Sequence, residues 1–228
     1  LNPVDKHAIE AAVAVKDAIG GTVTILTMGN ALAGEMMRDG IAIGADKGVL
    51  VSDERMAGSD TLATGLVLAK AIEKLGGADL VFTGKRSTDG DTGQIPPAIA
   101  QRLGMALISY ANSVSVDGTT VTATRLNHDG IETVQAQLPA VVSVTEKSNT
   151  PRSPKIRGKM AAKKAVFDVW KVEDLGLDAA SVGKSGSATK VTELFAPEPN
   201  PVGVMIEGAT PADAAANLIK ELTAKNLL

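Results

Sequence analysis

Residues 84–97 read GKRSTDGDTGQIPP and carry the residue types best suited to holding a small polar ligand. They follow a short apolar run at residues 79–83 and precede a helical pattern at residues 98–103, so a strand, a glycine-bearing turn and a helix start come together. Such a turn directs free backbone N–H groups and the positive end of a helix dipole toward one point, which suits a phosphate group. Gly84, Gly90 and Gly93 can adopt positive φ and let a ligand approach the backbone. An ordinary connection between a strand and a helix is the alternative interpretation.

The charges of this segment favour holding a nucleotide over cleaving one. Asp89 and Asp91 would repel a pyrophosphate if they were unpaired. We therefore expect them to cap the helix, brace the turn, or accept hydrogen bonds from ribose hydroxyls or an amine. The G-x-x-x-x-G-K-[ST] pattern is absent, which argues against phosphoryl transfer of the P-loop kind.

The composition excludes several other kinds of site. Cysteine is absent, which rules out disulfides, thiolate metal sites and cysteine nucleophiles. His7 and His128 are too few for a histidine metal site, so we predict neither a metal site nor an acid–base catalytic residue. The net charge of −3 argues against nucleic acid as a partner. No apolar run approaches the roughly 20 residues of a membrane-spanning helix and no signal peptide is visible, so we expect a cytoplasmic protein.

The elements that must position the loop alternate along the chain. Helical patterns and β-branched apolar runs follow one another at residues 3–18, 22–28, 31–43, 47–52, 61–75 and 79–83. This alternation predicts an α/β fold with a Rossmann-like parallel sheet covered by helices. Because ligands of such sheets lie beyond the carboxyl ends of the strands, we expect Met28, Gly29 and residues 84–92 to face one ligand from two sides.

The pattern changes after Gly104. Residues 113–124 predict an antiparallel hairpin insertion around Asp117-Gly118, and residues 131–138 and 140–144 predict further extended segments. Residues 183–188 are typical of a flexible link, Pro197, Pro199 and Pro201 favour an extended run, and residues 211–228 predict a terminal helix. We therefore expect a nucleotide-binding domain at residues 1–170 and a C-terminal arm at residues 171–228. The arm either contacts a partner subunit or packs on its own domain.

Residues 147–164 contain seven Lys or Arg residues and no acidic residue. Pro151 and Pro154 keep the first half from being helical, so the segment is an exposed loop. A solvated loop, a nucleic-acid patch and a docking surface are three possible interpretations. Aromatic residues for base stacking are absent, which weakens the second. Ile156 among cations resembles a hydrophobic anchor with an electrostatic rim, which favours docking of a protein partner.

Taken together, these motifs resemble the beta subunit of electron-transferring flavoproteins, collinearly from Leu1 to at least Phe195. The matching segments are N-P-x-D at Asn2, T-M-G ending at Gly29, I-A-I-G-A-D at residues 41–46, S-D-T-L-A-T at residues 59–64, D-G-D-T-x-Q at residues 89–94, L-P-A-V-V at Leu138, and I-R-G-K-M-x-A-K-K-A at Ile156. Family members begin roughly 30 residues earlier, with an additional strand of one βα-sized element.

The resemblance implies a heterodimer whose alpha subunit carries an electron-transferring FAD. The beta subunit of this family holds a second nucleotide, which is AMP in ordinary members and a second FAD in electron-bifurcating ones. AMP-type loops tend to read D-D-D-x-N-Q-T-G, whereas this chain has Asp89-Gly90-Asp91-Thr92-Gly93-Gln94, like the bifurcating form. Arg86, Ser87-Thr88 and Pro96 depart from the family loop.

The resemblance also assigns residues to sites. The cofactor-binding residues would be Asn2, Asp5, Met28, Gly29, Ser87, Asp89, Gly90, Asp91, Thr92, Gly93, Gln94 and Ile95. The partner-docking residues would be Arg152, Lys155, Ile156, Arg157 and Lys159. It implies NADH as the electron donor, ferredoxin or flavodoxin as a low-potential acceptor, and an acyl-CoA dehydrogenase-type flavoenzyme as the docking partner.

Two functions from other classes compete with this interpretation. A nucleotide-binding sensor of the universal-stress type shares an α/β fold, but the long arm and the basic loop argue against it. An adenylating enzyme would need an S-G-G-x-D-S motif, which is absent.

Overall fold

The computed structural model describes residues 1–200 and 202–228, so Pro201 of the expected proline run lies outside the described residues. The chain forms two compact units, Leu1–Lys190 and Val191–Leu228. Among the described residues, no helix combines the length and the apolar character needed to cross a membrane.

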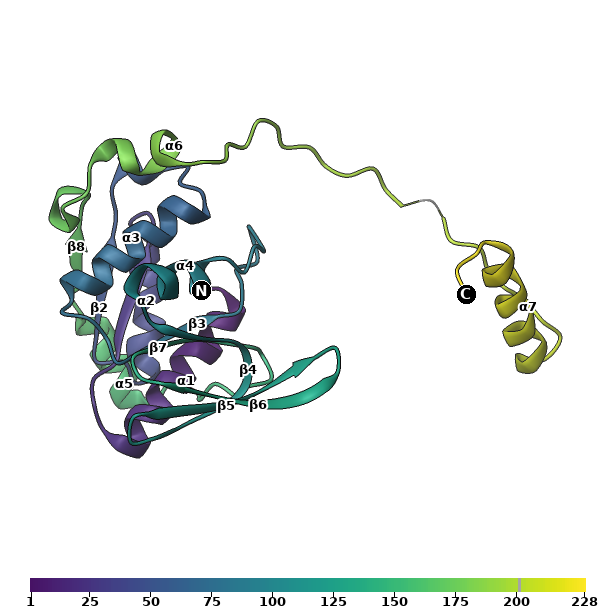
Figure 1. Cartoon of the computed structure of the whole chain (residues 1–228), viewed down its shortest axis with the longest axis horizontal. Coiled ribbons are helices and arrows are strands. Elements are labelled where there is room, and N and C mark those ends of the chain that lie inside the picture. The colour runs from purple at the N-terminus through teal and green to yellow at the C-terminus, as the bar shows by residue number, and fades with distance from the viewer. Residues whose placement is uncertain (201) are drawn as a thin grey trace. The chain divides into compact units, whose positions relative to one another are not determined.

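Helices and strands alternate through the first unit (Figure 1). Its helices are α1 (Pro3–Ile19), α2 (Leu32–Ile43), α3 (Thr61–Lys74), α4 (Ile95–Leu103), α5 (Ile156–Lys164) and α6 (Gly183–Gly186). Its strands are β1 (Thr24–Met28), β2 (Lys47–Val51), β3 (Leu80–Gly84), β4 (Ala106–Asp117), β5 (Thr120–Asn127), β6 (Gly130–Gln137), β7 (Ala140–Val144) and β8 (Asp168–Trp170).

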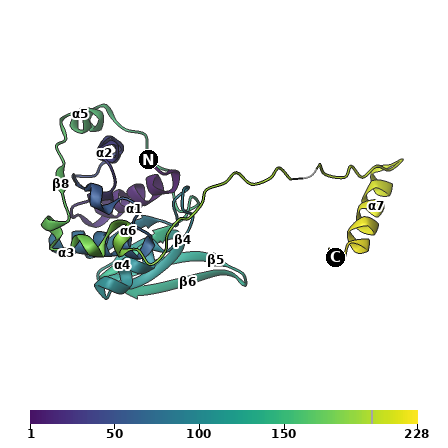
Figure 2. The same cartoon turned by 90° about the horizontal axis from the view of Figure 1, so that it is seen from above.

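The strands form a parallel sheet of order β1-β2-β8 and a mixed sheet of order β3-β7-β4-β5-β6. In the mixed sheet β3, β7 and β4 are parallel, whereas β4, β5 and β6 form an antiparallel meander. In Figures 1 and 2 the β5–β6 hairpin extends beyond the other strands. The expected α/β fold with a Rossmann-like parallel core and an antiparallel insertion is confirmed.

Alternating side chains on β7 explain how helices cover both faces of the mixed sheet. Ala140, Val142 and Val144 pack against Ala8 and Ala11 of α1. Val141 points the other way and packs with Ile72 of α3 and Ile99 of α4. Because successive side chains of a strand point to opposite faces, one fully apolar strand supports two helical layers.

Several elements differ from the sequence expectation. β4 begins at Ala106 and pairs with β7 before it enters the hairpin, so residues 106–112 belong to the parallel core. The second half of the basic segment forms α5, and residues 183–186 form the short α6 instead of a flexible link. Residues 171–190, which the sequence places in the arm, belong to the first unit, and Val172 and Val182 are buried in it with Val51.

The two sheets present facing edges to each other. Among the described residues, β1 pairs only with β2 and β3 pairs only with β7. A cavity of about 1020 Å³ lies between these edges and is lined by residues of both strands. A strand placed between the two edges would join the sheets into one, because both edges carry backbone groups without a strand partner.

The second unit consists of an extended segment followed by α7 (Pro211–Ala224). The Thr210 side chain accepts a hydrogen bond from the Asp213 backbone N–H, and the Asp213 carboxylate accepts one from the Thr210 backbone N–H. This capping box, together with Pro211 in the first turn, explains why the helix begins there.

Candidate functional site

The loop between β3 and α4 lies at the carboxyl end of a parallel strand, as the sequence predicts. β3 ends at Gly84, and α4 begins at Ile95 with Gln94 at its N-cap position. Gly93 has φ +64°, a conformation that favours glycine. Gly84 and Gly90 do not have positive φ, so they serve the loop differently. A Cβ at Gly84 would lie 2.5 Å from Asp5 Oδ1, so Gly84 is required for a close approach of α1.

The start of α1 braces the start of the loop. The Asn2 side-chain amide donates a hydrogen bond to the Arg86 carbonyl oxygen at 3.1 Å. The Gly84 backbone N–H donates to Asp5 Oδ1, also at 3.1 Å. Burial raises the pKa of Asp5, and the hydrogen bonds from Asn2 and Gly84 oppose that rise. Asn2 occupies the N-cap position without capping through its side chain, because that side chain is used on the loop.

The two carboxylates of the loop brace the turn. Arg86 forms an ion pair with Asp91, with 2.9 Å between Nε and Oδ1. The Asp91 backbone N–H donates to the Ser87 carbonyl oxygen at 3.2 Å, and Asp91 has φ +50°. A hydrogen bond from the Ser87 hydroxyl lowers the pKa of Asp89, and the Gly90 backbone N–H adds to the effect. Of the roles expected from the sequence, bracing is therefore the one with direct contacts.

The Gln94 side chain is held by a residue of α3, a helix that contributes none of the predicted cofactor-binding residues. The Thr61 hydroxyl, at the first position of α3, donates to Gln94 Oε1 at 2.6 Å. This bond orients the amide and leaves its Nε2 group able to donate elsewhere. Thr61 belongs to the S-D-T-L-A-T segment that matches the family. That match marks Thr61 as a family residue, but it does not predict the hydrogen bond to Gln94.

Met28 and Gly29 lie at the carboxyl end of β1. Met28 packs against the buried cluster that contains Val51 and Val67, and the Gly29 N–H donates to the Val51 carbonyl oxygen at 3.0 Å. Neither residue is among those that line the cavity between β1 and β3. Direct hydrogen bonds bring Asn2, Asp5 and the loop together. Met28 and Gly29 lie at the carboxyl end of β1, and their contact with the same ligand stays a prediction.

The cavity has a polar end at the loop. Its lining there includes Asn2, Thr83, Ser87, Thr92 and Gln94, whereas β1 and β3 contribute mostly apolar side chains. Within residues 1–200 and 202–228, the buried atoms Asn2 Oδ1 and Thr83 Oγ1 have no hydrogen-bond partner. An unsatisfied buried polar atom is costly, so these two atoms fit a site that takes a polar ligand.

The basic segment presents its anchor residue on α5. The Ile156 side chain is 80% exposed, and Lys155, Arg157 and Lys159 are exposed around it. The helix packs closely against α2 (Figure 2). Gly158 allows this approach, because a Cβ at this position would lie only 2.2 Å from the Ala42 carbonyl oxygen. Arg38 of α2 donates to the carbonyl oxygens of Ala162 and Ala165 at 2.5 and 2.9 Å, which satisfies the C-terminal end of α5.

Arg152 is positioned differently from the other four predicted docking residues. It forms ion pairs with Glu10 at 2.9 Å and with Asp17 at 2.7 Å, both on α1. The Glu10 carboxylate is nearly buried and also accepts from the Arg152 backbone N–H at 3.0 Å. Arg152 therefore anchors the segment to α1, and its side chain is only half available to a partner.

The described residues contain no group of three or more His, Asp or Glu side chains placed to hold a metal ion. The candidate site therefore consists of the loop, the start of α1, Thr61 and the polar end of the cavity. What it can do chemically is bind an anionic, hydrogen-bonding ligand at the start of α4.

Comparison with known proteins gives one consistent family. Residues 1–175 match the model of the electron transfer flavoprotein domain. The chain is 37% identical over 229 residues to the caffeyl-CoA reductase-Etf complex subunit CarD of Acetobacterium woodii, covering 100% of this chain and 87% of that protein. It is 40% identical over 214 residues to the electron transfer flavoprotein subunit beta of Megasphaera elsdenii, covering 91% and 79%. It is 40% identical over 205 residues to protein FixA of Bradyrhizobium diazoefficiens, covering 86% and 71%.

Proposed function

The chain belongs to the electron transfer flavoprotein family and matches its beta subunits, and on that premise we propose that it holds a second FAD within an electron-bifurcating heterodimer. Its partner subunit is the alpha subunit of the same family, which carries the other FAD. The observation that carries the proposal is the D-G-D-T-G-Q loop, in which glycine stands at position 90. A Cβ at Gly90 would meet nothing closer than Thr92 Cγ2 at 3.8 Å, so this side of the loop is open.

The residues that would hold the nucleotide are those at the polar end of the cavity. Thr92, Gln94 and the N-terminus of α4 would bind the pyrophosphate, because donors and the helix dipole converge there. Asn2 Oδ1 and Thr83 Oγ1 would gain partners on the ligand. The pairing of Asp91 with Arg86 supports the assignment, since it reduces the repulsion that two free carboxylates would exert on an anion.

The chemistry comes from the flavins when they are bound, and the protein sets their position and potential. Each NADH oxidised to NAD⁺ supplies two electrons. One electron would reduce ferredoxin or flavodoxin, and the other would pass through the alpha-subunit FAD to an acyl-CoA dehydrogenase-type acceptor. Two NADH therefore complete one two-electron reduction of that acceptor. In this scheme the described residues bind, orient and exclude water, and none of them acts as an acid or base.

Two observations support the proposed electron-accepting partner: the surface of α5 and the name of one relative. The name of the Acetobacterium woodii relative places that protein in a complex with a caffeyl-CoA reductase, which supports a CoA-thioester enzyme as the partner. Lys155, Ile156, Arg157 and Lys159 of this chain form the surface that such an enzyme would contact, with Arg152 holding the segment in place.

The second candidate is a carrier that holds AMP as a structural nucleotide and does not bifurcate electrons. The same phosphate-binding geometry would serve AMP, because both ligands contain an adenosine phosphate. A self-associating stress-type sensor would bind ATP reversibly and contain no flavin.

One preparation of the heterodimer distinguishes these functions. Flavin and AMP are counted in an acid extract, and ferredoxin reduction by NADH is followed with and without the acyl-CoA acceptor. We expect two FAD per heterodimer and ferredoxin reduction only when the acceptor is present. One FAD with one AMP, or ferredoxin reduction that ignores the acceptor, would establish the AMP-holding carrier instead.

A further inference from the structure

Tyr110 adopts a backbone conformation that a tyrosine rarely takes. Its φ is +59°, in the left-handed region, although it lies inside β4. The pairing of β4 with β7 shifts register between Ile108 and Ala111, and the pairing with β5 shifts between Ala111 and Ser113. Tyr110 therefore lies in a bulge, and bulges in strands commonly redirect a side chain next to a functional site.

The protein holds this conformation with a buried hydrogen bond. The Tyr110 backbone N–H donates to the Ser143 hydroxyl oxygen at 3.0 Å. Ser143 is 1% exposed and lies on β7, the strand next to β4. A buried hydroxyl on the central strand of the core is thus used to satisfy an N–H that the bulge removes from the ladder. The core therefore stabilises the bulge, because loss of this bond would leave the Tyr110 N–H and the Ser143 hydroxyl without a hydrogen-bond partner.

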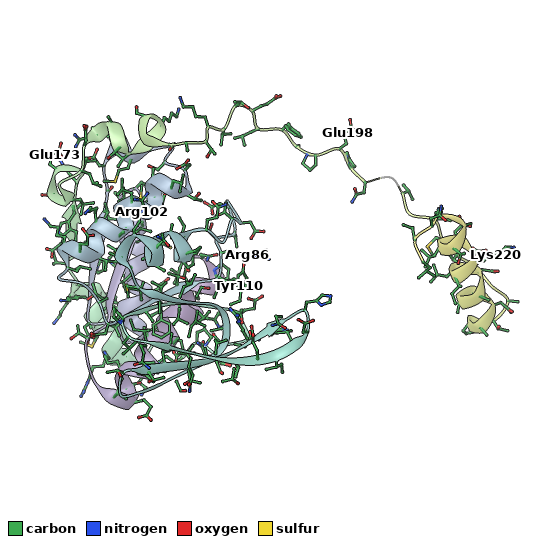
Figure 3. The ribbon with its side chains drawn as sticks, in the orientation of Figure 1. Arg86, Arg102, Tyr110, Glu173, Glu198 and Lys220 are labelled. Carbon is green, nitrogen blue, oxygen red and sulfur yellow. The ribbon has the colours of Figure 1, made fainter. Side chains whose placement is uncertain are left out.

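The redirected side chain reaches the nucleotide loop. A Cβ placed on Gly93 would lie 3.0 Å from the Tyr110 hydroxyl oxygen, so the phenol lies directly on the loop at its left-handed glycine. Figure 3 labels Tyr110 on the flank of the first unit from which this loop projects. The side chain is 45% exposed, and its hydroxyl has no hydrogen-bond partner among the described residues.

The start of α4 has few backbone donors of its own. Pro96 and Pro97 occupy its first turn, and proline has no N–H. A helix normally offers its first four N–H groups to an anion, so two are missing here. The Gln94 N–H is already directed to Thr92 Oγ1 at 3.4 Å. Backbone donors are therefore few at this helix start, and an anion bound there would need further hydrogen bonds from side chains.

We propose that Tyr110 is a further nucleotide-binding residue, whose hydroxyl donates a hydrogen bond to the phosphate group held at the start of α4. The proposal rests on the proposed function and deepens it, since it adds a ligand-contacting residue from a strand that the loop motif does not include. The ligand chemistry is an adenosine phosphate, which AMP and FAD share.

The test compares the unaltered protein with Tyr110→Phe, which removes only the hydroxyl. Binding of AMP, FAD and adenosine to nucleotide-free protein is measured by calorimetry, and thermal unfolding is recorded for both proteins. We expect Tyr110→Phe to bind AMP and FAD about tenfold more weakly, because a hydrogen bond to a charged phosphate is lost. Adenosine, which has no phosphate, is the matched control, and its affinity should not change. The unfolding temperature should not change either, because the hydroxyl has no protein partner to lose.

The outcomes separate this inference from the proposed function. Equal affinity of the two proteins for AMP and FAD would overturn the inference and leave the nucleotide site intact. An equal loss for all three ligands, or a lowered unfolding temperature, would make Tyr110 a structural residue and would also overturn it. Wild-type protein that binds none of the three would contradict the proposed function, and the inference with it. A deficit for FAD alone would also overturn the inference, because the proposed contact is with a phosphate group that AMP and FAD share.

Discussion

At the scale of single residues, the loop at positions 85–94 arranges its charges before any ligand binds. Arg86 is paired with Asp91, and the Ser87 hydroxyl donates to Asp89, which lowers the pKa of Asp89. The lowered pKa keeps Asp89 ionised at neutral pH, and both carboxylates already have partners. The other cation of the loop, Lys85, is already paired with Glu146, so an additional carboxylate would find no free cation in the loop and would face the phosphate site directly.

The substitution Gly90→Asp adds such a carboxylate. A Cβ at this position meets nothing closer than 3.8 Å, so we expect the fold to remain stable while nucleotide content falls. Repulsion between two like charges a few ångströms apart costs about 1–4 kcal/mol, which weakens binding at least about fivefold. Flavin and AMP content per heterodimer measures the effect. Gly90→Ala is the matched control, since it adds the Cβ without the charge. Two FAD per heterodimer in Gly90→Asp would contradict the assignment of this loop.

At the scale of elements, the sequence predicts those segments whose local pattern agrees with their final environment. The helices α1, α2 and α3 and the strand β7 are predicted because apolar periodicity and burial coincide in them, and the Asp60 cap adds to this signal in α3. β4 was predicted only from residue 113, because its first half pairs in parallel with β7, a partner some 30 residues later in the chain. Non-local pairing of this kind leaves no local signal in the sequence.

The same argument explains what was missed in the site. The D-G-D-T-G-Q motif identifies the loop, because its glycines and carboxylates are adjacent in sequence. Thr61 and Tyr110 reach the loop from α3 and β4, so only the folded chain brings them there. α5 was predicted as a loop because prolines precede it and its composition is cationic. Its helix is stabilised by tertiary contacts of Gly158 and Arg38 with α2.

The substitution Ile156→Ala tests α5 as a docking element. We expect weaker binding of the acyl-CoA dehydrogenase-type partner and slower electron delivery, with nucleotide content unchanged. Removing an aliphatic anchor from an interface costs about 1–3 kcal/mol. Ile131→Ala on β6 is the matched control, since both isoleucines are 80% exposed in this chain. Turnover at limiting partner concentration is the measurement, and equal rates for the two variants would show that Ile156 is not the anchor.

At the scale of the whole molecule, the two units differ in how much of their apolar surface is buried. The first unit buries its own core between two helical layers and two sheets. In the second unit no described residue of α7 is buried, and Leu218 and Ile219 are 45% and 58% exposed. The extended segment before α7 also exposes Val191, Leu194, Phe195, Val202, Val204 and Met205. Apolar surface on this scale is typical of a segment that packs against a partner, which supports the arm as a contact with the alpha subunit.

The last prediction places one charge on the apolar face of α7. In Leu218→Glu, pairing with the alpha subunit should weaken by at least about tenfold, because a buried aliphatic contact is lost and a carboxylate must be desolvated. Thermal unfolding of the first unit should not change, because its core clusters contain no residue of the second unit, Val191–Leu228. Lys220→Gln on the same helix (Figure 3) is the control, since it makes the same change of −1 in net charge away from Leu218. Heterodimer formation is measured by size-exclusion chromatography with the flavin absorbance of the alpha subunit as the signal. If Leu218→Glu pairs as tightly as Lys220→Gln, α7 does not contact the alpha subunit, and the first unit must supply the interface.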